Sequence, residues 1–169
     1  MERNTKNKTL TLCAMMTALG LLCLLMASMM PGMRIAFTAI AGVVAAITIV
    51  HGSLGYGLLT VIATALLALL LVPSKDIVLL YAAFFGPYTV IKNLIERLNK
   101  LPLEWALKLL FCAADVTLLF LFADQVAAMV PTMLSAHLWA LVPVVLVIFA
   151  AYDVVFSKLI AYVFQRMHI

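Results

Sequence analysis

Three charged residues, Lys92, Asp115 and Asp153, lie within long apolar stretches of this chain, where they could do chemistry. A carboxylate at the centre of a membrane helix costs about 2.5–3.5 kcal/mol on insertion scales, so a residue of this kind marks a functional site by default. Asp115 and Asp153 could bind and release protons or other cations. Alternatively, one of them pairs with Lys92 or Lys158 and only holds the helices together. The sequence leaves both interpretations open.

A second group of polar side chains lies at the connections between the apolar stretches. If the helix ends converge, a few polar anchors with aromatic walls would form the usual kind of small-ligand site. The alternative is that these residues are solvated loop charges or part of an interfacial aromatic belt. The group consists of Arg34, Lys75, Asp76, Asp124, Gln125 and His137, with Tyr81 and Trp139 close by in the sequence.

The first apolar stretch contains a pair of small residues, Ala14 and Ala18, four positions apart. Small residues at this spacing let another helix approach closely within a membrane, where burial of apolar surface gives no drive for association. The pair therefore indicates a surface that docks a partner helix. Because alanine is abundant in this chain, the spacing can also arise by chance.

Enzyme and metal signatures are absent from the sequence. The three cysteines lack metal-ligand spacing, and the three histidines are scattered. The glycines between residues 52 and 57 join two apolar stretches with no strand before them, so they predict a turn followed by close helix packing. We therefore expect no catalytic residues, no metal and no cofactor.

Six long apolar stretches must position all of these residues. Hydrophobic residues make up 67% of the chain, against roughly 45–50% in soluble domains. About 20 apolar residues are needed to cross a bilayer as a helix, and the stretches lack the period-two alternation of barrel strands. The sequence predicts an all-α polytopic membrane protein, a single compact domain over residues 1–169. The predicted spans are about 9–30, 34–50, 53–72, 77–98, 103–123 and 137–164.

The basic residues predict the orientation of these spans. Of the eleven lysines and arginines, all but Arg34 and Lys75 fall on one side, and lysine and arginine near span ends stay cytoplasmic. Both termini are therefore expected in the cytoplasm. The net charge of +4 is explained by orientation, so nucleic-acid binding is not expected. The cytoplasmic set is Arg3, Lys6, Lys8, Lys92, Arg97, Lys100, Lys108, Lys158 and Arg166.

Six spans, cytoplasmic termini, a basic start and the segment Ala14-Met15-Met16-Thr17-Ala18 resemble the substrate-binding S components of energy-coupling factor (ECF) vitamin transporters. Related uncharacterised bacterial membrane proteins of that superfamily are equally similar. The stretch Arg34–Leu71 is similar to the second and third helices of that group.

The resemblance implies a protein of the bacterial inner membrane that captures a small vitamin-like micronutrient from outside. It would dock on a transmembrane coupling subunit that is shared with two cytoplasmic ATPases, and Ala14 and Ala18 would contact that subunit. Mid-span Asp115 departs from the expected neutral core and leaves the mapping of the last helices open. The implied pocket residues are Arg34, Lys75, Tyr81, Tyr88 and Gln125.

Two other functions remain open from the sequence. The chain could be a structural or regulatory membrane protein whose helix faces recruit partners without any small ligand. It could also be an ion-coupled carrier that uses Asp115 and Asp153. No repeat indicates two inverted halves, which self-sufficient carriers commonly show.

Overall fold

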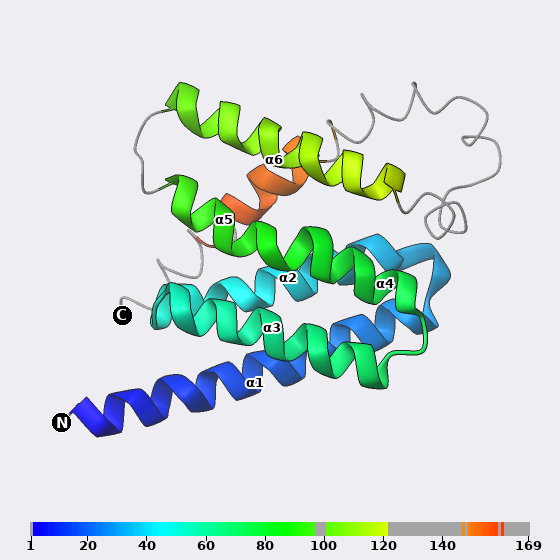
Figure 1. Ribbon diagram of the computed structural model, residues 1–169. Helices are drawn as coiled ribbons and strands as arrows, with labels where there is room; N and C mark the ends of the chain where they lie inside the picture. The colour runs from blue at the N-terminus through cyan, green and yellow to red at the C-terminus, as the bar shows by residue number, and fades with distance from the viewer. Residues whose placement is uncertain (1, 97–100, 122–146, 148, 159, 161–169) are drawn as a thin grey trace. The chain divides into compact units, whose positions relative to one another are not determined.

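The computed structural model is helical, with short turns and no strand in the part of the chain that it describes (Figure 1). Two compact units divide the chain, unit 1 at residues 1–104 and unit 2 at residues 105–169. Unit 2 contains most of α6 (Leu101–Leu121) and a helical stretch at 149–158. The described residues are 2–96, 101–121, 147, 149–158 and 160.

Unit 1 is built from helices that run back and forth beside one another (Figure 1). The α1/α2 and α3/α4 connections lie at one end, which we call the junction end, and the α2/α3 connection lies at the other. Its elements are α1 (Glu2–Met29), the 3-10 turn η1 (Pro31–Met33), α2 (Arg34–His51), α3 (Leu54–Leu71), α4 (Lys75–Leu80), the π-helical turn η2 (Tyr81–Phe85) and α5 (Gly86–Glu96).

Four helical stretches are long and apolar enough to cross a membrane, and they match the first four predicted spans within a few residues. The predicted fifth span, 103–123, corresponds to α6, which carries Glu104, Lys108 and Asp115 and is not among the four. Most of the predicted sixth span, 137–164, lies outside the described residues. An all-helical fold with apolar membrane-length helices is thus confirmed. The four stretches are Lys6–Met29, Pro31–His51, Leu54–Leu71 and Lys75–Ile95.

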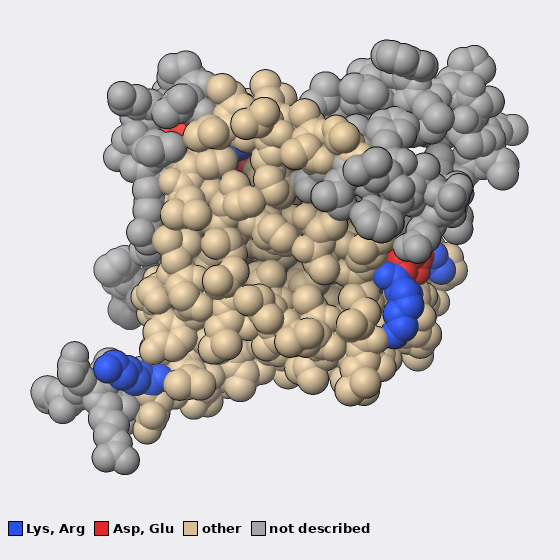
Figure 2. All heavy atoms as spheres, in the orientation of Figure 1, with Lys and Arg blue, Asp and Glu red and all other residues tan. Residues whose placement is uncertain are grey.

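Helix α2 lies at the centre of unit 1 and packs against α1, α3 and α5. Six consecutive residues, 41–46, are buried, so this helix is covered on all sides in its middle. A helix that is apolar all round belongs in the interior of a bundle. Small residues such as Gly42 and Ala45 let its neighbours approach closely. The outer helices instead expose large apolar side chains, and the described surface in Figure 2 carries few charged residues.

The glycine segment after α2 is a turn followed by close helix packing, as the sequence predicted. A Cβ atom placed on Gly57 would lie 2.0 Å from Cγ1 of Ile49, so only glycine allows α3 to pack this closely against α2. Gly55, two residues earlier on the same helix, has room for a side chain. The nearest atom to a Cβ placed there lies 3.7 Å away. The glycines therefore serve helix packing.

The fourth apolar stretch is continuous but contains a π-helical turn, which the sequence analysis did not predict. The backbone N–H of Gly86 bonds to the carbonyl of Tyr81, five residues earlier. Pro87 has no N–H to offer to the Ala83 carbonyl, and its ring would crowd that carbonyl in a regular α-helix. A widened turn before the proline relieves this conflict. Gly86 also allows α5 to approach Val61 of α3 closely.

Candidate functional site

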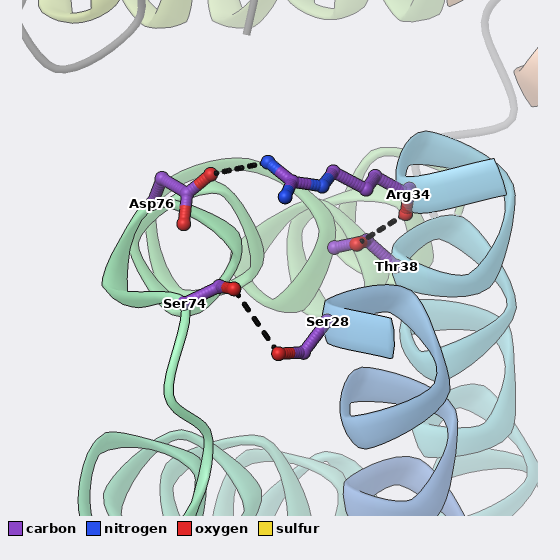
Figure 3. Close-up of polar contacts among 5 residues, drawn as sticks. All are labelled: Ser28, Arg34, Thr38, Ser74 and Asp76. Atoms are coloured by element: carbon purple, nitrogen blue, oxygen red, sulfur yellow. Dashed lines mark hydrogen bonds and ion pairs between the residues drawn. The ribbon is translucent and has the colours of Figure 1, made fainter. Parts of the chain in front are cut away.

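Consecutive residues at the start of α4 bond to different helices of unit 1, and we call residues 74–76 the junction (Figure 3). The hydroxyls of Ser74 and Ser28 lie 3.1 Å apart, which joins the junction to α1. Nη1 of Arg34, the first residue of α2, donates to Oδ2 of Asp76 at 3.1 Å. A hydrogen bond and an ion pair thus hold the junction to the ends of α1 and α2.

Lys75, between these two residues, turns to α3. Its ammonium donates to the carbonyls of Leu69 and, at 3.1 Å, Val72. The last carbonyls of a helix have no partners within the helix and carry partial negative charge, so a lysine there stabilises the helix end. The sequence grouped Lys75 with Arg34 as a ligand contact. The structure instead gives its ammonium a capping position at the end of α3.

Arg34 keeps unused hydrogen-bonding capacity at this end of unit 1. Its Nε is buried and has no hydrogen-bond partner among the described residues. The side chain is 31% exposed, so the guanidinium lies partly in contact with solvent. The first turn of α2 contains no acidic residue and has no side-chain cap. Among the residues that the structure describes, Asp76 provides the carboxylate that faces this arginine.

The two tyrosines predicted as pocket walls are core residues in the structure. Tyr81 is fully buried in η2, and its hydroxyl lies beside Thr64 without a hydrogen bond of ordinary geometry in the described part of the chain. Tyr88 is also fully buried and stacks on Phe84, with ring centroids 6.1 Å apart. Gln125 lies outside the described residues. Among the predicted pocket residues that the structure describes, Arg34 and Lys75 are both in contact with solvent, and Arg34 also has a buried Nε without a partner.

The predicted docking pair lies on an exposed face of α1. Ala14 and Ala18 are both exposed, whereas Cys13 and Thr17, their neighbours in sequence, are buried. This alternation follows from the helix period, because residues four apart share a face and adjacent residues do not. Within the described ranges, both alanines are open to a partner helix.

A buried ion pair joins two helices of unit 2. Nζ of Lys108 in α6 lies 2.8 Å from Oδ2 of Asp153, and the two side chains are only 7% and 6% exposed. Lys108 is therefore one partner of Asp153, a pairing that the sequence did not predict. Lys158 is exposed, because it follows Asp153 by five residues and so lies on a different face of the helix.

The other predicted intramembrane charges are only partly placed. Lys92 is 1% exposed in α5 of unit 1. Asp115 belongs to α6, but its side chain lies outside the described part. Among the side chains that are described, no group of three or more His, Cys, Asp or Glu residues could hold a metal ion.

Three features of the described residues bear on function: the junction with Arg34, the exposed face of α1 and the Lys108–Asp153 pair. The chain matches no protein-family model, no curated protein and no solved structure.

Proposed function

We propose that this protein is a substrate-binding membrane subunit of an importer of the energy-coupling factor type. It spans the bacterial inner membrane six times with both termini in the cytoplasm. It captures a small vitamin-like micronutrient from outside and docks on a transmembrane coupling subunit that works with two cytoplasmic ATPases. The exposed small-residue face of α1 is the observation that carries this proposal.

The α1 face has the properties of a helix-docking surface. Ala14 and Ala18 are exposed on a helix whose other side packs against α2 and α3. A large side chain at either position would hold a partner helix away, whereas alanine allows backbones to approach. Large apolar neighbours such as Met15 and Leu22, 62% and 58% exposed, would flank the contact. This face of α1 therefore combines small residues, which let a partner helix come close, with large apolar side chains on either side that a second membrane protein could contact.

The distribution of charge supports an outward-facing junction end. Lys6 and Lys8 are exposed near the start of α1, at the end opposite Arg34. By the positive-inside rule the basic end faces the cytoplasm. The junction and Arg34 then face the outside, where a micronutrient arrives. The partner face and the ligand end are separate parts of unit 1, so each can be changed without the other.

The buried ion pair disfavours a proton-coupled carrier. Protonation of Asp153 would remove the negative charge from its buried contact with Lys108, and breaking a buried ion pair costs on the order of 3–5 kcal/mol. A carboxylate held in this way serves as a lock between helices. A regulatory protein without a ligand uses the same α1 face and is distinguished only by the absence of a bound small molecule.

A tagged pull-down from native membranes in mild detergent, followed by mass spectrometry, tests the proposal. We expect the wild type to retain a membrane subunit and two ATPases, and the double variant Ala14→Leu/Ala18→Leu to lose them. Ala36→Leu, at an exposed position of α2, is the matched control and keeps the complex. Unchanged recovery of the ATPases with the double variant, or no ATPase with the wild type, would contradict the proposal.

A further inference from the structure

We infer that the ligand of this protein carries a carboxylate, and that this carboxylate replaces Asp76 on the guanidinium of Arg34. The inference rests on the proposed function, because it names the chemical class of the substrate. Asp76 then occupies the site while the ligand is absent. The geometry of the ion pair, the unused donor and the charge of the junction end all favour such a ligand.

The Arg34–Asp76 pair is incomplete in the described structure. A single contact joins it, from Nη1 to Oδ2 at 3.1 Å. Arginine binds carboxylates best through two parallel N–H···O bonds, which are stronger and more specific than one. Both side chains are partly exposed, at 31% and 22%. A weak, partly solvated contact of this kind is worth little, so an incoming anion can displace it.

The buried Nε of Arg34 indicates which contact is missing. Among the described residues it has no acceptor, although a buried donor without a partner costs about 1–3 kcal/mol. Nε and a terminal nitrogen lie along one edge of the guanidinium and can hold both oxygens of one carboxylate. Asp76 bonds to Nη1 and leaves Nε without an acceptor.

The charge at the junction end favours an anion. Arg34 and Lys75 contribute two positive charges and Asp76 one negative charge, so the described groups there sum to +2 − 1 = +1. Arg34 is also the first residue of α2, and a helix N-terminus carries partial positive charge. The ammonium of Lys75 is bound to carbonyls of α3. These two contacts leave one N–H of the exposed Lys75 unused, so Arg34 and Lys75 can both attract an anionic ligand to this end.

Matched acids and neutral analogues test this inference on the detergent-purified full chain. The probes are nicotinate with nicotinamide, pantothenate with pantothenol, and biotin with biotin amide. Unfolding temperature gives the affinity of each probe, and native mass spectrometry identifies any small molecule that copurifies. We expect an acid, or a copurifying carboxylate, to bind the wild type at least tenfold more tightly than its neutral analogue.

Variants of the pair and one control complete the test. Arg34→Gln should weaken acid binding at least tenfold. Arg34→Lys should weaken it as well, because an ammonium lacks the planar pair of N–H groups that binds both oxygens of a carboxylate. Asp76→Asn should bind the acid three- to tenfold more tightly, because the internal competitor is gone. Ser28→Ala breaks only the Ser28–Ser74 contact and should leave binding unchanged.

Each outcome decides between the inference and the proposed function. A bound neutral molecule, or an acid that binds Arg34→Gln as it binds the wild type, overturns the inference and leaves the binding subunit in place. A tenfold loss of acid affinity in Asp76→Asn also overturns it, since Asp76 would then support the ligand. If no probe binds and nothing copurifies with folded wild-type protein, the inference and the proposed function both fail.

Discussion

Removing one partner of the Lys108–Asp153 pair should destabilise the protein far more than removing both. The two charged atoms lie 2.8 Å apart and their side chains are less than a tenth exposed. With an effective dielectric constant of about 20, two unit charges at this distance attract each other by roughly 6 kcal/mol. Desolvation offsets most of this gain in the intact pair. A single deletion instead removes the opposite charge of this pair from a buried group, at a cost of about 3–5 kcal/mol.

The expected pattern is a strongly non-additive double-mutant cycle. Lys108→Met and Asp153→Leu should each lower the free energy of unfolding by about 3–5 kcal/mol. The double variant should lie close to the wild type, because apolar residues of similar volume often replace a buried pair without loss. Lys158→Met, at an exposed position of the same helical stretch, is the control and should change stability by less than about 0.5 kcal/mol.

Equilibrium unfolding in mixed micelles, with increasing sodium dodecyl sulfate, measures these four free energies. Coupling between the two sites is the difference between the double variant and the sum of the single variants. Costs that simply add, or single variants as stable as Lys158→Met, would refute the argument. They would show that the pair is not a buried lock and would reopen a proton-carrying role for Asp153.

Substitutions at Gly57, Thr89 and Pro87 test the packing and helix geometry of unit 1, with Gly55→Ala and Thr89→Ser as controls. Gly57→Ala should destabilise the protein by about 1–3 kcal/mol through the clash with Ile49, whereas Gly55→Ala has room and should be neutral or stabilising in the same unfolding assay. Thr89→Val removes the hydroxyl that bonds to α2 at 2.9 Å and should lower the free energy of unfolding by about 0.6–1.7 kcal/mol. Thr89→Ser keeps the hydroxyl and should retain most of the stability. An equal loss of stability in both variants would assign the effect to packing. Pro87→Ala restores a donor after η2 and should convert the π-helical turn to a regular α-helix, which would be visible as a changed register of α5 in a structure of the variant.

The sequence predicted the helices of unit 1 because their signals are local. Apolar stretches of membrane length and the Pro31-Gly32 and Val72-Pro73 breaks determine where the helices end. The π-helical turn has a local cause too, in Gly86-Pro87. That signal could have been read from the sequence, since a proline within a helix must disturb the preceding turn.

The contacts between helices could not be predicted in the same way. Lys108 and Asp153 are 45 residues apart, and their pairing depends on how two helices are rotated about their axes. The role of Lys75 depends on how tightly the chain turns after α3, which a hydropathy pattern does not contain. Tyr81 was expected in a pocket because it lies near a helix end, but the neighbouring helices cover it completely.

Sidedness of labelling in intact cells tests the central claim, that the junction end of unit 1 faces outward to receive a ligand. Gly32 and Ser53 are both exposed and lie at opposite ends of unit 1. A membrane-impermeant maleimide should react with Gly32→Cys in intact cells, and with Ser53→Cys only after permeabilisation. Labelling of Ser53→Cys from the medium, with Gly32→Cys protected until the cells are opened, would contradict the account.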